Sequence, residues 1–228
     1  MPATAANTPS HEPPAPCLAY RAYRLGFPER QARAFAVARD WYARGRKLDM
    51  RALASELGVS RPTLYRWVGS RERLLEDVIW SFAEELLAVA VRRARGDGSA
   101  RIMSILREFT AQIVAAPALR RFLEMDAEIA LRVLTRRDGG VEGRLVRAVA
   151  ELLDDEVRAS GLSLPLETPE MAYLIVRVVE AFLYNDAIAA LEPDLEAAAM
   201  VVELLLKGAQ PSAGAKSSHL QQPLPVRH

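Results

Sequence analysis

The sequence predicts an all-α protein in which a small N-terminal helix-turn-helix domain is followed by a larger helical domain. Apolar residues recur at spacings of three and four through most of the chain, and no stretch shows sustained alternation of apolar and polar residues. Glycine and proline residues divide these stretches into lengths typical of single helices. Half of the 228 residues are hydrophobic and 26% are charged, so the chain can bury a substantial core.

The expected elements follow from this pattern. In the N-terminal part, helices are expected at 28–44, 49–57, 60–68 and 70–95. Gly96, Asp97 and Gly98 resemble a hinge, after which helices are expected at 99–115, 117–136, 140–160, 169–190 and 193–208. The resulting division is a disordered arm (1–18), a DNA-binding domain with a long connecting helix (19–95), an effector-binding and dimerisation domain (96–208) and a disordered tail (209–228).

Residue types important for catalysis and metal binding are scarce. The single cysteine, Cys17, excludes an internal disulfide, and the three histidines (His11, His219 and His228) all lie in the expected disordered ends. No glycine-rich phosphate loop occurs, and neighbouring acids such as those at 154–155 fit a solvated helix face. We therefore expect a protein that is not an enzyme and has no metal or cofactor. Without a signal peptide or an 18-residue apolar run, a cytoplasmic location away from membranes is expected.

Charge is distributed unevenly along the chain. Residues 20–95 hold 16 basic against 9 acidic residues, whereas the rest of the chain holds 14 basic against 20 acidic ones. A basic N-terminal third is expected where one part of a protein meets a polyanion. A chance imbalance of surface charge is the alternative, so the charge distribution indicates nucleic-acid binding only together with a DNA-binding motif.

That motif is the stretch 53–67, which is typical of two short helices joined by a tight turn. Gly58 supplies the positive φ that ends the first helix, Ser60 is a good N-cap, and Leu64 is placed to fill the shared core together with Val59. Arg61, Thr63 and Arg66 are then left on the outward side of the second helix. A helix-turn-helix presents such a helix to the major groove of DNA, although an ordinary helical hairpin with solvated arginines would share the pattern.

The context of this motif resembles the tetracycline-repressor (TetR) family of regulators. The matching segments are Gly58-Val59-Ser60, Thr63-Leu64-Tyr65 and Ser70-Arg71-Glu72-Arg73-Leu74, and the resemblance covers about 28–95. Two positions depart from the family pattern: Val68 stands where phenylalanine is usual, and Arg71 where lysine is common. The neighbouring Trp67 can supply the missing bulk, and Arg71 keeps the positive charge.

The resemblance implies roles for individual residues. Thr63, Tyr65 and Arg71 would contact phosphates, and Arg61 and Arg66 would read bases. With the capping serine included, the predicted DNA-binding set is Ser60, Arg61, Thr63, Tyr65, Arg66 and Arg71. The segment 20–24 before the first helix is either an arm that reaches DNA or a loosely packed, solvated stretch.

The last two expected helices carry more apolar surface than one buried face needs. These residues are Met171, Leu174, Ile175, Val178, Val179 and Phe182 in one helix and Leu195, Ala198, Ala199, Val202, Leu205 and Leu206 in the next. Because TetR-family proteins pair through their last two long helices, a homodimer is expected. Simple burial in the core of one chain is the alternative.

Polar and methionine side chains within apolar helices of this domain favour a ligand pocket, with ordinary core filling as the alternative. The predicted ligand-binding set is Met103, Phe109, Phe122, Met125, Tyr173, Arg177 and Tyr184. The stretch 173–195 is also similar to the C-terminal domains of actinobacterial regulators that control degradation of quorum-signal lactones.

Together these observations predict a repressor that is released from a palindromic operator by a small, mostly apolar effector, with a lactone among the candidates. The alternative is a DNA-binding dimer that has no small-molecule ligand. A filled C-terminal core would favour the dimer without a ligand, and a cavity with converging polar groups would favour the sensor.

Overall fold

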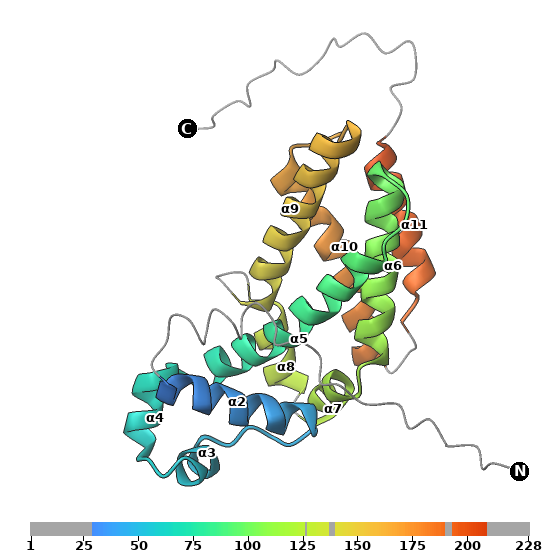
Figure 1. Ribbon diagram of the computed structural model, residues 1–228. Helices are drawn as coiled ribbons and strands as arrows, with labels where there is room; N and C mark the ends of the chain where they lie inside the picture. The colour runs from blue at the N-terminus through green and yellow to red at the C-terminus, as the bar shows by residue number, and fades with distance from the viewer. Residues whose placement is uncertain (1–28, 126, 137–139, 190–192, 209–228) are drawn as a thin grey trace, which may run out of the picture.

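The computed structural model describes residues 29–125, 127–136, 140–189 and 193–208, and the elements within these ranges are ten helices (Figure 1). The predicted arm and tail, and the segment 20–24, lie outside the described residues. The all-α prediction is confirmed. Helix α5 runs from the group formed by α2, α3 and α4 to the C-terminal helices (Figure 1).

The N-terminal helices are α2 (Glu29–Ala43), α3 (Met50–Glu56), α4 (Arg61–Val68) and α5 (Arg71–Arg93). Three of them begin at a side chain that accepts a hydrogen bond from a backbone N–H three residues later: Asp49 for α3, Ser60 for α4 and Ser70 for α5. Gly58, at φ 69°, makes the turn between α3 and α4. Because a Cβ at this position would meet nothing within 4 Å, the backbone conformation and not crowding favours glycine there.

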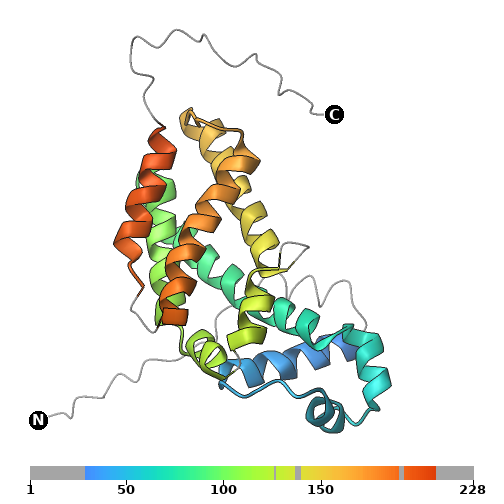
Figure 2. The same ribbon diagram turned by 180° about the vertical axis from the view of Figure 1, so that it is seen from behind.

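The C-terminal helices are α6 (Gly98–Ala115), α7 (Pro117–Met125), α8 (Ala127–Leu134), α9 (Val141–Ser160), α10 (Thr168–Ala189) and α11 (Leu195–Lys207). The helix predicted at 117–136 is described in two parts, α7 and α8, on either side of residue 126, which lies outside the described residues. Viewed from behind, α10 and α11 lie side by side, and α6 packs against α11 (Figure 2).

The buried apolar residues do not follow the expected boundary at 96. The N-terminal core contains Phe35, Trp41, Leu64 and Leu74, but also Phe122 of α7 and Val133 of α8. A second core joins α6, α9, α10 and α11, and a third joins α5 to α6. The short helices α7 and α8 are therefore packed on the N-terminal helices, although they come after the glycine hinge in sequence.

In the described part of the chain, no single helix is long and apolar enough to cross a membrane. Helices α6 and α7 are long and apolar enough to cross a membrane only when taken together, and the two are bent by 57° relative to each other. Ile102, Ile105 and Phe109 of α6 are buried in the second and third cores.

Candidate functional site

The outward face of α4 carries exposed, mostly basic side chains. Leu64 and Val68 are buried against α2 and α5, which leaves Arg61, Tyr65 and Arg66 exposed on the opposite side. Trp67 is partly buried against the same core, as expected for a residue that compensates for the small Val68. The arrangement holds a short helix by its apolar face and directs two guanidinium groups outward, which is what a recognition helix requires.

Two of the other predicted DNA-binding residues are engaged at the start of α4. The Ser60 hydroxyl accepts a hydrogen bond from the Thr63 backbone N–H at 3.3 Å and lies 2.8 Å from the Thr63 hydroxyl. These contacts fix the first turn of the helix. Ser60 and Thr63 therefore position α4, and any contact that they make with a phosphate is additional to this capping role.

Arg71, also predicted to contact a phosphate, lies at the first position of α5. Its Nε donates a hydrogen bond to the backbone carbonyl of Leu48 at 2.8 Å, and its side chain is partly buried. The bond ties the start of α5 to the segment just before α3. Arg71 thus has a structural partner that sequence reasoning did not anticipate, because residue 48 is distant in sequence.

A cavity of about 290 Å³ lies between the N-terminal helices and the C-terminal domain. Helices α2 and α5 form one side of it, and α6, α7, α8, α9 and α10 form the rest. Its polar wall residues are Tyr42, Glu85 and Glu180. Burial raises the pKa of Tyr42, so its phenol stays protonated at neutral pH. The remaining wall is apolar or small: Ala43, Ile79, Phe82, Ala83, Leu86, Phe109, Ile113, Ala116, Pro117, Ala118, Leu119, Leu134, Val141, Leu145, Val179 and Leu183.

Of the predicted ligand-binding residues whose side chains are described, Phe109 lines this cavity. Met103 is buried in the core that α6 shares with α9, α10 and α11. Phe122 and Met125 border a much smaller space of about 10 Å³ beside α2 and Arg71. Tyr173 is partly buried elsewhere on α10, Arg177 lies next to the wall residue Glu180, and the side chain of Tyr184 lies outside the described part of the chain.

Glu180 belongs to a buried cluster of charges that the sequence did not reveal. Its side chain is 4% exposed, and its Oε2 accepts a hydrogen bond from Arg177 Nη1 at 2.8 Å. The same Arg177 nitrogen is 3.8 Å from Oε1 of Glu142, a residue of α9 that is 3% exposed. Burial and the charge of Glu142 raise the pKa of Glu180 to about 7, against the opposing effect of Arg177.

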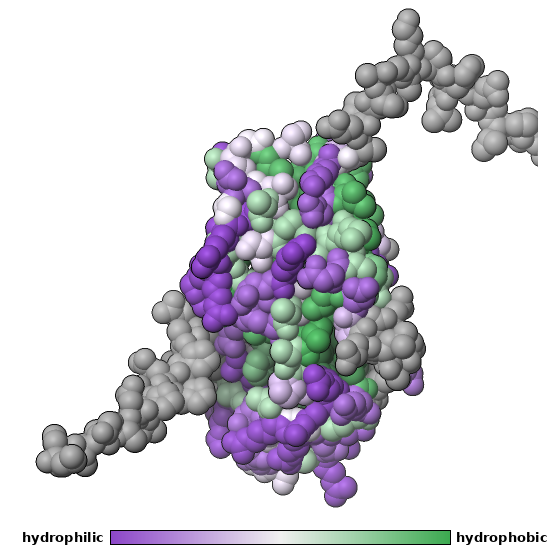
Figure 3. All heavy atoms as spheres, turned by 90° about the vertical axis from the view of Figure 1, so that its right-hand side faces the viewer, coloured by the Kyte–Doolittle hydropathy of each residue, from purple (hydrophilic) through white to green (hydrophobic). Residues whose placement is uncertain are grey.

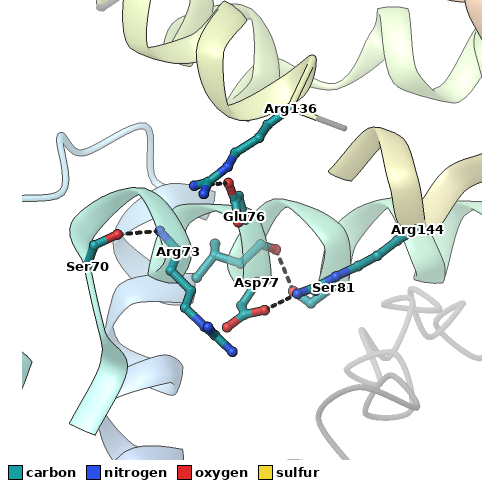
Figure 4. Close-up of polar contacts among 8 residues, drawn as sticks. Ser70, Arg73, Glu76, Asp77, Ser81, Arg136 and Arg144 are labelled. Carbon is teal, nitrogen blue, oxygen red and sulfur yellow. Dashed lines mark hydrogen bonds and ion pairs between the residues drawn. The ribbon is translucent and has the colours of Figure 1, made fainter. Parts of the chain in front are cut away.

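Two arginines of the C-terminal domain reach back to the first half of α5 (Figure 4). Arg144 of α9 pairs with Asp77, and Arg136, just after α8, lies 3.5 Å from the buried Glu76. Burial is the main cause of the raised pKa of Glu76. These pairs connect the cavity-lining part of the C-terminal domain to the helix that directly follows α4.

Comparison with known proteins agrees with this architecture. A family model described as "Tetracyclin repressor-like, C-terminal domain" matches residues 97–207. The solved structure of QsdR, a TetR-family transcriptional repressor from R. erythropolis, superposes with a TM-score of 0.74 at 27% identity, covering 83% of this chain and 98% of QsdR. The chain is therefore similar, over most of its length, to the TetR family of transcriptional regulators. No curated protein sequence matches it.

The two short helices that the motif at 53–67 predicted are α3 and α4, with Gly58 in the turn between them. The cavity was harder to foresee, because its wall combines residues from seven helices that are up to 141 positions apart. The signal for Glu180 was its place on one helix face with Arg177, but the sequence alone fits a surface ion pair equally well. Within the described residues, no group of three or more His, Cys, Asp or Glu side chains could hold a metal ion.

Proposed function

We propose that this protein is a TetR-family repressor that binds a palindromic operator as a homodimer and leaves it when a small apolar effector enters the cavity. The observation that carries this proposal is the position of the cavity. Tyr42 and Ala43 of α2, Phe82 and Leu86 of α5, and Val179 of α10 border the same space. A ligand bound there would touch the DNA-binding domain and the C-terminal domain at once.

The size and lining of the cavity fit a small apolar molecule. Its volume of about 290 Å³ is at the lower end of the roughly 300–1,000 Å³ typical of small-molecule pockets. A ligand changes DNA binding only if it prefers one arrangement of the DNA-binding heads, and couplings of about 1–3 kcal/mol are typical. The similarity of 173–195 to regulators of lactone degradation makes a lactone one candidate effector.

The alternative, a DNA-binding dimer without a ligand, calls for a C-terminal domain that is filled with side chains. The cavity supports the sensor instead, because its concave and mostly apolar wall is the kind of surface that a small molecule binds. We expect a protein to keep such a space where a ligand occupies it.

Exposed apolar residues on α11 support the homodimer. Met200 and Leu204 are each 63% exposed, lie one helical turn apart, and have Val201 beside them at 36%. The side of the molecule that carries α11 has a band of apolar surface between hydrophilic regions (Figure 3). Because a two-fold dimer buries the same patch of both subunits, this face together with α10 is the proposed interface. Two recognition helices would then face one side of a palindromic DNA site.

The burial of the residues on α11 indicates which of them should be substituted to test the dimer. Val202 is 1% exposed and Leu205 packs on the same core, so both belong largely to the interior of one subunit. Met200 and Leu204 are the apolar residues on α11 that point away from that core. We therefore place the proposed interface on these two residues and not on Val202.

The test begins with a selection in which the protein itself picks its operator from a pool of random duplex DNA. Fluorescence anisotropy would measure operator affinity with and without 1-decanol or an N-acyl homoserine lactone. A Leu86→Trp variant fills the cavity, and Leu166→Trp is the control because Leu166 is 42% exposed and does not line the cavity.

We expect a probe that enters the cavity to weaken operator binding by about 5- to 150-fold. Leu86→Trp should bind operator in the absence of a probe but lose this response, and Leu166→Trp should keep it. If no probe binds the wild-type protein or releases it from operator DNA, the proposed effector role is wrong and the ligand-free dimer is supported. If no specific DNA is selected at all, the operator role fails as well.

A further inference from the structure

The charges around the proposed effector site narrow the chemistry of the effector. We propose that the cavity takes an apolar molecule carrying a positively charged nitrogen, and that the carboxylate of Glu180 binds this nitrogen. This inference rests on the proposed function, because it assigns a ligand class to the same cavity.

The charged residues of the cavity wall are both acidic. Among the described residues that line it, Glu85 and Glu180 carry charge, and none is Lys, Arg or His. Glu85 already has a close cation, since Arg39 Nη2 lies 2.6 Å from its Oε2. The charge of Glu85 is thereby balanced. The charges around Glu180 therefore determine which ligand charge the cavity favours.

Around Glu180, the acidic groups of the described residues outnumber the basic ones. Glu180 and Glu142 are both almost fully buried, and they share one cation, Arg177, whose side chain is 46% exposed. The second oxygen of Glu142, Oε2, is buried and has no hydrogen-bond partner. Two buried carboxylates with one half-exposed guanidinium leave a net negative charge beside the cavity. A buried charge without a partner is costly, so this position favours a cation.

A bound proton can supply that positive charge when the cavity is empty. Burial and Glu142 raise the pKa of Glu180 to about 7, which means that this carboxyl is partly protonated at neutral pH. A ligand cation at the same place would replace the proton. The other titratable groups on the wall, Tyr42 and Glu85, add no positive charge.

The rest of the wall suits the apolar part of such a molecule. Phe82 and Phe109 add aromatic rings to the wall, which suit hydrocarbon, and the guanidinium of Arg39 lies over the Phe82 ring, 4.2 Å from its centroid. A carboxylate ligand would instead be repelled by Glu180 and Glu142. A neutral ligand with a carbonyl, such as a lactone, could accept a hydrogen bond from Glu180 only when this carboxyl is protonated, so the contribution of Glu180 to its affinity would depend on pH with the opposite sign.

The experiment compares three probes of equal chain length: decylamine, 1-decanol and decanoic acid, with an N-acyl homoserine lactone as a fourth. Isothermal titration calorimetry on the full-length protein would measure each affinity at about pH 6 and about pH 8, where the amine stays charged. We expect decylamine to bind tightest. Its affinity should fall about tenfold from the higher to the lower pH, because at the lower pH it must displace a proton from Glu180.

A substitution separates the role of Glu180 from that of the cavity. Glu180→Gln keeps the shape of the side chain and removes its charge, so decylamine should bind at least about tenfold more weakly while 1-decanol is nearly unaffected. Glu156→Gln is the control, since Glu156 is also buried and paired with an arginine, Arg101, but does not line the cavity. It should leave the affinity for decylamine unchanged.

The outcomes distinguish this inference from the proposed function. If 1-decanol, decanoic acid or the lactone binds wild-type protein better than decylamine does, the cavity is an effector site but not one for a cation. The same conclusion follows if affinity for decylamine falls with rising pH or survives Glu180→Gln. If none of the four probes binds, both the cation site and the effector site are overturned.

Discussion

Arg144 of α9 donates a hydrogen bond to Asp77 of α5, with 2.5 Å between Nη2 and Oδ1. The two residues are 67 positions apart and each side chain is 25% exposed. Val141 and Leu145, which flank Arg144 on α9, line the large cavity, whereas Asp77 lies in the second turn of the helix that follows α4. The pair therefore joins α9, beside the cavity, to α5, the helix that follows α4 (Figure 4).

Arg144→Met should change the operator affinity of the ligand-free protein and reduce the response to an effector. The contact holds α5 in one position relative to α9, so its loss should let the DNA-binding head move. A partly exposed ion pair contributes only about 1 kcal/mol or less to folding, so the melting temperature should change little. Arg158→Met is the matched control, because Arg158 pairs with Asp155 inside α9 and does not reach α5. Equal operator affinities for the two variants would show that the Arg144 contact does not transmit the signal.

Arg66→Ala should weaken binding to the selected operator by about 1–3 kcal/mol and leave weak binding to random duplex DNA nearly unchanged. Arg66 is exposed on α4 and is free of any role in capping that helix. Arg71→Ala should weaken binding to both DNAs and reduce the salt dependence, and it should also disturb the segment before α3 by removing the bond to Leu48. Anisotropy titrations over a range of salt concentrations measure both effects. A loss of equal size on both DNAs for Arg66→Ala would remove this residue from the base-reading set.

The double variant Met200→Glu with Leu204→Glu should be a folded monomer that has lost operator binding. Both side chains are largely exposed in one subunit, so charge there should cost little folding stability but should oppose burial in a dimer. Val202→Glu is the contrasting variant, because burying a carboxylate at a position 1% exposed should unfold the domain. Sedimentation velocity and thermal melting distinguish the two. A wild-type protein that sediments as a monomer at micromolar concentration would contradict the dimer.

Glu180 should make the folding stability depend on pH. Its pKa is raised to about 7 in the folded protein, from the ordinary glutamate value of 4.5. The folded state therefore holds an extra proton between these values, and this contribution to stability is fully present below the unfolded pKa and is lost as the pH rises through about 7. Glu180→Gln should remove that dependence and stabilise the protein above neutral pH, by up to about 3 kcal/mol. Urea titrations at several pH values measure it, and an unchanged pH profile in the variant would contradict the assignment.

Much of the fold could be predicted because its causes are local. Caps at Ser60 and Ser70, the turn at Gly58 and the apolar spacing along the chain are set by neighbouring residues, and they placed the helices within a few positions of where they lie. The outward face of α4 followed in the same way, since burial of Leu64 leaves Arg61 and Arg66 on the other side. These properties depend on residues at most four positions apart.

What the sequence left open depends on packing between distant segments. Whether Phe122 lines a pocket or fills a core is decided by its contact with Tyr42, 80 positions earlier, where the two rings lie 5.8 Å apart. Arg177 and Glu180 could equally have formed a surface pair, and the approach of Glu142 from α9 places a second buried carboxylate beside the same guanidinium. The sequence by itself thus determined the helices, the family resemblance and the recognition helix. The tertiary structure decided the cavity, its acidic wall and the contacts that join it to α5, because these arise from helices whose relative positions no local pattern specifies.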